Sequence, residues 1–526
     1  MTNPPNCQPT IGRWFESDRE FRVFIIAVCA SFIAKGIAAV NGAFSVDDIL
    51  FINSPFDGAA VKEVSFRDGR LLYPLFLEML WRLGLDSQKS TSISFLVFTL
   101  CLVLTAQLAC RVWKIEKDFC ACLCVVLFAT LHPYQADFLT WKIGAITSGI
   151  PLLLSLYGLW RAAKYKSRYS LAFGALCIAI SLNIHQIGIS WVAVTVCFSL
   201  IFALLRKNSN IKETLTSSRA FTQLLVMIFG IALYLLALII FRFSSDDPAQ
   251  SNALYTANLS SIASQASTFL NLIIYKNPFF TFLADLFFAF FLFSFLFICF
   301  RSIWNKNTTR GLKAGILASL SLAVLFAAIS CAIFPTITLQ KGQLFPRTMS
   351  ALGLFWGALC AALIVHLRQK IYRKTLLGIL SITFFVFIGI NNQIFSEQIR
   401  ANHRDIELGR KLINKITALE GHQFIERVAI IGTNQDSLSG LRFPLDLSNP
   451  QRLEIGIVMS IFANQYSNQY RVSLLNDALG GNFLGELDNA QAEEATSYCR
   501  YSLTANGKFP SAGSVVRSGQ LAIVCL

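Results

Sequence analysis

The sequence predicts an α-helical protein that spans a membrane about 11 times and carries a small α/β domain at its C-terminal end. Three observations support this fold class. Hydrophobic residues make up 54% of the chain and charged residues only 14%, whereas soluble domains carry roughly 25% charged residues. Apolar segments of membrane-spanning length recur up to residue 391. Beyond residue 391, helix-like and strand-like patterns alternate with polar stretches.

The expected spans are identified by length, because a helix needs about 20 apolar residues to cross the hydrocarbon core. They are 22–43, 92–110, 119–132, 143–160, 170–183, 187–205, 221–241, 279–300, 314–334, 348–366 and 375–391. Segments 119–132 and 170–183 are shorter than a full span. The first run contains Lys35 and follows a head of mixed charge, so we interpret it as a retained anchor rather than a cleaved signal peptide. Residues 1–391 thus form the membrane bundle and residues 392–526 a separate domain.

Basic residues predict the orientation of this bundle. They cluster at 161–168, 206–219, 301–313 and 368–374, which all fall on one side if 11 spans are counted. By the positive-inside rule that side is the cytoplasm, which also receives the N-terminus. The loop 44–91 and the C-terminal domain are then external. The formal charge of +15 is spread over these short runs, which argues against a nucleic-acid-binding surface.

The apolar stretch Leu71–Leu85 is too short to span a membrane. One face, at a spacing of four residues, carries Pro74, Glu78, Arg82 and Asp86, opposite a broad apolar surface. This pattern favours a helix lying in the membrane interface. The alternative is a helix packed against the bundle.

The C-terminal domain is expected to combine helices and strands. Ser396–Leu419 has helical apolar spacing, whereas Val428–Ile431 and Leu521–Leu526 have the pattern of buried strands. Cys499 and Cys525 are the only cysteines in this polar block. In an oxidising compartment two such cysteines are candidates for a disulfide.

Two adjacent carboxylates, Asp47 and Asp48, directly follow the first span. A carboxylate at this position can act as a general base on an incoming hydroxyl, and its neighbour can orient that hydroxyl or help to hold a divalent cation. The pair does not decide whether a cation takes part, and no cofactor or other metal site is expected. The alternative is a capping pair at the start of a local turn, because Asp is favoured as a helix N-cap.

Cationic residues are predicted on the same external side as the acidic pair: Lys62, Arg67, Arg70, Lys142, Lys341 and Arg347. Arg and Lys bind phosphate groups well, Arg often through two parallel hydrogen bonds. Basic groups that face an acidic pair would suit a substrate with a phosphate leaving group, and we expect Arg67 and Asp68 to contact that substrate. The alternative for Arg347 is a turn that starts a helix at Pro346.

Polar residues close the two short spans on this external side. His132 and Gln135 follow the third span, and His185 and Gln186 follow the fifth. Two short helices ending in polar residues imply a recess in the outer leaflet, and we expect these four side chains to contact substrate there. The alternative is that each satisfies a local hydrogen bond. Lys35 lies inside a span and is a candidate functional residue, because a charged side chain is costly in lipid. The alternatives are that it snorkels to the interface or pairs within the bundle.

The chain resembles a known family in these features taken together. A long first span, the external Asp47–Asp48 pair, Gly69–Arg70, a flat helix, a many-span bundle and a terminal external domain are similar to the serotype-converting O-antigen glucosyltransferases of enteric bacteria and their phages. Those enzymes belong to the GT-C superfamily of polytopic glycosyltransferases. The resemblance covers the architecture of the whole chain, and at residue level only the Asp pair and Gly69–Arg70.

The resemblance implies an activity, a location and partners. Such enzymes sit in the bacterial inner membrane and take a hexose, usually glucose, from a polyprenyl-phosphate carrier on the periplasmic side. They attach it to O-antigen repeat units that are still linked to lipid, and depend on a donor synthase and a flippase. By similarity, Asp47 or Asp48 is the base, and Arg70, Arg347 and Lys341 or Lys142 hold the donor phosphate. The helix 71–85 borders the path of the lipid, and the terminal domain helps to hold the glycan.

Two other functions remain open. One is an O-antigen polymerase or another lipid-linked sugar transferase of the same bundle type. The other is a transporter of lipid-linked sugars, but transporters often show repeated halves around a site at the membrane midplane. Here no repeated halves are evident and polar residues gather on one surface, which favours an enzyme.

Overall fold

The computed structural model describes residues 17–41, 44, 45, 48, 65, 66, 69–85, 91–140, 142–205, 219–244, 346–367, 369–444, 457–464, 468–505, 508–511 and 513–526, with short pieces between 289 and 327. The predicted site residues Asp47, Arg67, Asp68 and Lys341 lie outside the described residues, as does Lys62. Most of the predicted spans 279–300 and 314–334 also lie outside them.

Helices form at each of the other predicted spans. They are α1 (Asp18–Asn41), α5 (Thr91–Trp113), α6 (Phe119–Leu131), α8 (Lys142–Tyr165), α9 (Arg168–Ile184), α10 (Gly188–Leu205), α12 (Arg219–Ser244), α17 (Ala351–His366) and α18 (Lys370–Thr417). Within the described residues, five helices are long and apolar enough to cross a membrane. A sixth arises if α6 and residues 133–140, bent by 48° at a short break, count as one span. The chain is therefore a mostly helical protein with several candidate spans, and the total of 11 is not confirmed.

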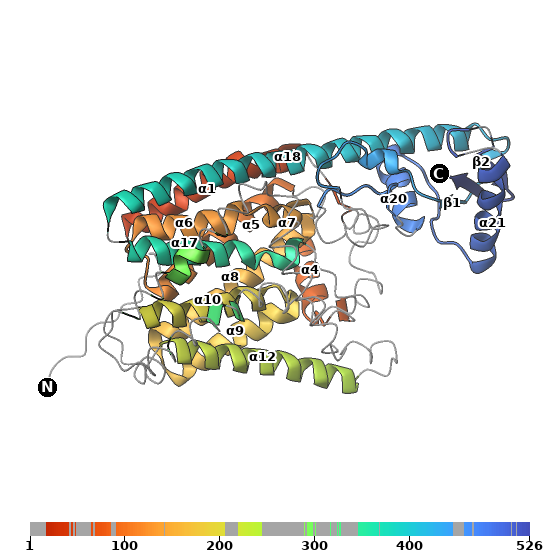
Figure 1. The fold of residues 1–526 in the computed structure, drawn as a ribbon. Helices are drawn as coiled ribbons and strands as arrows, with labels where there is room; N and C mark the ends of the chain where they lie inside the picture. Colours follow the sequence, from red (N-terminus) through yellow and green to blue (C-terminus); the bar gives the residue numbers. More distant parts are fainter. Residues whose placement is uncertain are drawn as a thin grey trace.

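The helices stack in layers (Figure 1). The outermost layer holds α1 and α18, the next α5, α6 and α17, and the last α8, α9, α10 and α12. Small residues permit a close crossing of α8 and α9: a Cβ on Gly158 of α8 would lie 2.6 Å from Cys177 Cβ and 3.0 Å from the Gly174 carbonyl oxygen of α9. Such small-residue contacts are typical of helices that pack in lipid, where close backbone approach replaces the hydrophobic effect as the attraction.

The buried Lys35 supports the short helix α6. Its Nζ donates a hydrogen bond to the Thr130 carbonyl oxygen, and Asn391 Nδ2 donates to the neighbouring Leu131 carbonyl oxygen at 2.8 Å. These carbonyls lie in the last turn of α6, where helix carbonyls have no partner within the helix. A cation at a helix C-terminus also opposes the negative end of the helix dipole. The contact gives Lys35 a structural role, in agreement with the alternative of pairing within the bundle.

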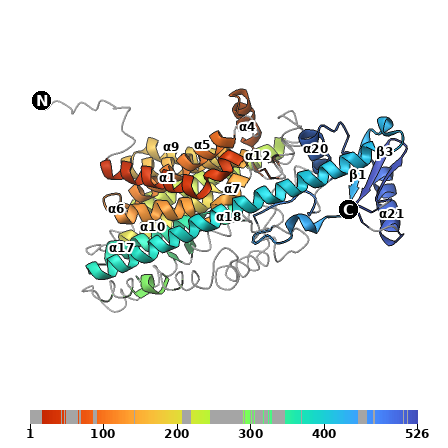
Figure 2. The ribbon, with the colours of Figure 1, turned by 90° about the horizontal axis from the view of Figure 1, so that it is seen from above.

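The last predicted span and the helix expected after it are one continuous element. Helix α18 runs for 48 residues, about 72 Å at 1.5 Å per residue, from the bundle into the C-terminal domain (Figures 1 and 2). No Gly or Pro occurs between residues 391 and 396. The side chains of Asn391 and Asn392 bond to carbonyls one turn back and do not end the helix. The boundary predicted at 391 therefore lies within one continuous helix.

The C-terminal domain has the predicted α/β composition. Strands β1 (Arg427–Ile431) and β3 (Leu521–Cys525) pair in parallel, and β2 (Val515–Ser518) pairs antiparallel with β3 in the order β1-β3-β2. The end of α18 and α20 (Asn468–Leu479) pack on one face of this sheet, and α21 (Asn489–Ala505) packs on the other. Both predicted strands form, and β3 is buried along its whole length because helices cover both faces. A disulfide between Cys499 and Cys525 joins α21 to β3.

Helix α4 (Tyr73–Arg82) occupies the stretch predicted to lie flat. Tyr73 and Leu77 pack against Ile184 of α9, and Glu78 and Arg82 form an ion pair at 2.6 Å one turn apart. Leu75 is 63% exposed and Leu83, just past the helix, 68% exposed. One side of α4 therefore packs on the bundle, as the alternative expected, while an apolar side stays uncovered by the described residues. Its placement in the membrane interface stays a prediction.

Asp405 is a buried carboxyl group in the C-terminal domain, beyond the predicted span 375–391. It accepts hydrogen bonds from Ser460 Oγ at 2.7 Å and from the Ile461 amide at 2.8 Å. Burial raises the pKa of Asp405 from its usual value of 3.8 to about 6, although these hydrogen bonds partly oppose the shift.

We expect this raised pKa to make the domain less stable as pH rises. The pKa of Asp405 is higher in the folded state than in the unfolded state, so its contribution to the free energy of unfolding is complete below about pH 4. This contribution falls by about 3 kcal/mol up to roughly pH 6 and stays constant above it. Asp405→Asn should remove this fall, because the amide oxygen can accept from Ile461 while its NH₂ donates to Ser460. Pulse proteolysis of the full chain in urea at pH 4.5 and 7 measures the effect. An equal pH response of Asp405→Asn and the exposed control Asp436→Asn would contradict the expectation.

Candidate functional site

Residues from widely separated predicted loops meet at the end of the bundle nearest the C-terminal domain. Hydrogen bonds join the 44–48 segment to Lys142 and to Asn402, the 69–72 segment to Gln186 and to Asn183, and residue 347 to Asp137. All of these residues belong to segments predicted on the external side. The path of the described chain is therefore consistent with the grouping of loops predicted from the basic residues.

Asp48 is almost completely buried at this end, with an exposed fraction of 1%. Its Oδ1 accepts a hydrogen bond from the Lys142 amide at 3.0 Å, and its Oδ2 accepts from the Ser45 amide at 2.9 Å and Ser45 Oγ at 3.3 Å. Lys142 is the first residue of α8, so Asp48 caps this helix from a distant loop. Asp48 therefore has a structural role, but it caps a helix that is distant in sequence and not only a local turn. The same bonds hold its carboxyl group in a fixed orientation.

Arg70 is held by a short chain of polar contacts. Its Nε donates to Gln186 Oε1 at 3.1 Å, Gln186 Nε2 donates to Tyr234 Oη at 3.3 Å, and Tyr234 Oη donates to the Gly69 carbonyl oxygen at 3.1 Å. The guanidinium also lies 5.8 Å from the centre of the Tyr73 ring. Gln186 and Tyr234 are buried, whereas Arg70 is half-buried. Two buried side chains therefore hold a guanidinium group that is partly exposed to solvent.

Arg347 and His185 form the neighbouring part of the site. The Arg347 amide donates to Asp137 Oδ2 at 3.0 Å, and Arg347 Nη1 lies 3.5 Å from Asp137 Oδ1. Burial lowers the pKa of His185 well below its usual value, and the positive charges of Arg70 and Arg347 lower it further. His185 is therefore a neutral imidazole at neutral pH, near two positively charged side chains that disfavour its protonation.

His132 and Gln135 lie in the bend between α6 and α7 (Ala136–Thr140). His132 Nδ1 accepts from the Tyr134 amide at 3.3 Å, and Gln135 Nε2 donates to the Ser350 carbonyl oxygen at 3.0 Å. Both side chains are buried. These contacts shape the bend, and through it position Asp137 and Lys142.

Two residues of this site were not predicted. Ser45 lies three residues before Asp48, and this S-x-x-D spacing is a recognised capping pattern that could have identified it. Tyr234 lies inside the apolar helix α12, where an isolated hydroxyl among aliphatic residues is the corresponding signal.

A divalent cation at the acidic pair stays a hypothesis, because Asp47 lies outside the described residues. These residues contain no group of three or more His, Cys, Asp or Glu side chains placed to hold a metal.

Gly69 is expected to be required for the position of Arg70. Its φ is +71°, and an added Cβ would lie 2.9 Å from Tyr234 Oη. Gly69→Ala should cost about 1–2 kcal/mol in backbone strain and a further 1–3 kcal/mol in overpacking. Gly84 is a matched control, because its φ is +75° but nothing lies within 4 Å of an added Cβ.

The measurement is the unfolding temperature of each variant in detergent. Gly69→Ala should lower it clearly more than Gly84→Ala. Equal effects of the two substitutions would mean that the contact with Tyr234 contributes nothing.

Comparisons with known proteins add no second source of information about this site. No family model, curated protein or solved structure matches the chain. The site is therefore defined by its own geometry: a buried carboxylate at a helix N-terminus, with two arginines and a neutral histidine at the same end of a membrane-type bundle.

Proposed function

We propose that this protein is a membrane glycosyltransferase that moves a hexose from a polyprenyl-phosphate donor to a lipid-linked glycan on the external side of the bundle. By the resemblance described above, the hexose is glucose and the acceptor is an O-antigen repeat unit in the periplasm. The observation that carries the proposal is the presence, at one end of the bundle, of an oriented carboxylate and two half-buried arginines. A lipid-phosphate sugar donor requires groups of both kinds near the membrane surface.

The acidic pair supplies the base in this reaction. A carboxylate of Asp48 or Asp47 takes the proton from an acceptor hydroxyl, whose oxygen then forms a bond to C1 of the sugar. At the same time the bond between C1 and the phosphate oxygen of the carrier breaks. Hydrogen bonds to Asp48 from Ser45 and from the Lys142 amide limit the rotation of its carboxyl group, which supports a role in orientation or proton transfer.

The arginines stabilise the leaving group. When the bond to C1 breaks, the polyprenyl phosphate gains negative charge, and a fixed cation lowers the energy of that charge. Arg70 has its Nε bonded to Gln186, and Arg347 is positioned by Asp137, so each guanidinium is held before substrate arrives. His185 is neutral and can donate one hydrogen bond to a substrate oxygen without adding a charge.

The surrounding elements match the needs of two lipid-linked substrates. Exposed Leu75 and Met79 on α4 would contact acyl or polyprenyl chains as they approach Arg70. The C-terminal domain, carried beyond the bundle on α18, would help to hold the glycan of the acceptor (Figure 2). A donor synthase and a flippase would supply the donor on this side of the membrane.

Glycan analysis tests the proposed function directly. O-antigen from cells with the gene should gain the mass of one hexose on a repeat unit, and O-antigen from cells without it should not. A second arm supplies polyprenyl-phosphate glucose to membranes that contain the protein and follows labelled sugar into lipid-linked acceptor. Movement of an intact lipid-linked sugar across the bilayer, with no new glycosidic bond, would instead identify a transporter.

A further inference from the structure

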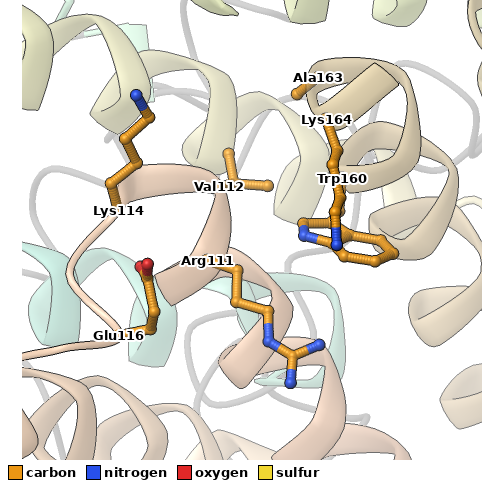
Figure 3. A pocket seen from close by; sticks show the side chains of 7 residues that line it. All are labelled: Arg111, Val112, Lys114, Glu116, Trp160, Ala163 and Lys164. Atoms are coloured by element: carbon orange, nitrogen blue, oxygen red, sulfur yellow. The ribbon is translucent and has the colours of Figure 1, made fainter. Parts of the chain in front are cut away.

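A second polar site lies at the other end of the bundle. A pocket of about 230 Å³ is lined by Arg111, Val112, Lys114, Glu116, Trp160, Ala163 and Lys164 (Figure 3). It is formed by the last turns of α5 and α8 and by the residues after α5. Lys142, which bonds to Asp48, begins α8, and Lys164 lies one residue before its end, about 33 Å away along the helix. The pocket is therefore separate from the proposed transferase site.

Its lining is mainly cationic. Three basic side chains and one carboxylate line it, and Lys114 and Lys164 are exposed. Arg111 is fixed by buried Glu20 through bonds of 2.8 and 2.9 Å to the two carboxylate oxygens. The Trp160 ring lies 4.8 Å from Lys164 Nζ and 5.8 Å from Arg111 Cζ. Glu116 comes from the segment after α5 and lies across the pocket from Trp160 and Lys164 (Figure 3). Because its carboxylate repels an anion, a bound anion is favoured on the Trp160 side.

The surroundings have the character of a membrane interface. Tyr165 and Tyr169, next to the pocket in sequence, are 57% and 89% exposed, and Arg161 lies 4.6 Å from the Phe173 ring centre. Exposed aromatic rings mixed with basic residues are typical of the headgroup level of a bilayer. The predicted cytoplasmic loops begin here, and anionic lipids are concentrated in the cytoplasmic leaflet.

We infer that this pocket binds a phosphate group, supplied by the headgroup of an anionic phospholipid or by a soluble phosphate ester. Its volume lies below the roughly 300–1,000 Å³ of sites that enclose drug-sized ligands, so it fits a headgroup and not a large cofactor. Lys164 and Arg111 attract the phosphate, and Trp160 and Val112 offer an apolar wall to the glycerol. Bound lipid would tie α5 to α8 at the membrane surface.

Lipid retention by the full-length protein tests this inference. The protein is placed in nanodiscs of phosphatidylcholine with a minor share of phosphatidylglycerol, and the phosphatidylglycerol that stays bound is counted by native mass spectrometry. Lys164→Gln should reduce it about fivefold, the effect of one lysine near an anionic surface. Lys166→Gln is the matched control, because Lys166 is exposed just past the end of the same helix but does not line the pocket.

Glycerol phosphate, added to protein in pure phosphatidylcholine, distinguishes the two sources. Lys164-dependent retention of phosphatidylglycerol alone identifies a lipid site, and Lys164-dependent binding of glycerol phosphate alone identifies a soluble ligand. If Lys164→Gln and Lys166→Gln match the unchanged protein with both probes, the inference is wrong. Arg111 is left in place, because its loss would strand the buried charge of Glu20.

Discussion

Asp48→Asn is expected to lower hexose transfer by about 10²–10⁴-fold, the usual contribution of a general base. The amide cannot take a proton from the acceptor hydroxyl. It also replaces one acceptor oxygen with a donor NH₂, which would face the amide of Ser45 or that of Lys142. The measurement is the initial rate of labelled glucose transfer in membranes supplied with polyprenyl-phosphate glucose.

The controls for Asp48→Asn separate chemistry from folding. Asp436→Asn removes an exposed carboxylate of the C-terminal domain and should leave the rate unchanged. Asp47→Asn, measured beside it, shows which carboxylate of the pair carries the proton. The unfolding temperature of each variant is also measured. If the rate falls only because α8 has lost its cap, the unfolding temperature falls as well. Full transfer by both Asp47→Asn and Asp48→Asn, with normal insertion, would rule out the acidic pair as the base.

Arg70→Gln is expected to lower transfer by about 10- to 150-fold, because a hydrogen bond to a charged group contributes about 1.5–3 kcal/mol. The leaving phosphate would lose a cation that Gln186 and Tyr234 hold in place. Arg70→Lys should recover part of the rate, since it restores the charge but not the planar group with two donors. Initial rates at several donor concentrations measure the change in kcat/KM.

Arg82→Gln is the matched control for Arg70→Gln. Arg82 lies at the end of α4, with its side chain 73% exposed, and its ion pair is with Glu78 one turn away. Surface pairs of this kind contribute little, so transfer should change less than twofold. An equal loss in both variants would indicate a general effect of charge at the membrane surface and not a phosphate contact at Arg70.

Local patterns were sufficient to predict most helices and strands. Apolar length predicted α5, α10 and α12 to within a few residues, and short apolar runs predicted β1 and β3. The continuity of α18 was not predicted, because hydropathy falls after residue 391 although nothing in the backbone chemistry ends the helix. The composition shows where the hydropathy of the chain falls, whereas the continuity of the helix across that point is visible only in the fold.

The sequence predicted residues of the site but not the hydrogen bonds that join them. Asp48, Arg70, Arg347 and His185 were expected on one side because the basic loops define the alternation of the spans. Their partners were not, since the cap on Lys142 and the bond to Tyr234 join residues 94 and 165 positions apart. No local pattern contains that information.

By itself the sequence determined that this is a mostly helical chain with several candidate membrane spans, a C-terminal α/β domain and polar loops that alternate between two sides. These properties depend on neighbouring residues, through apolar length, charge and helical or strand periodicity. Only the tertiary structure decided that Lys35 supports α6, that Asp48 caps α8 and that His185 lies near two arginines. Those roles depend on burial and on distances between helices, which arise when small residues allow the helices to pack and bring distant polar groups to one end of the bundle.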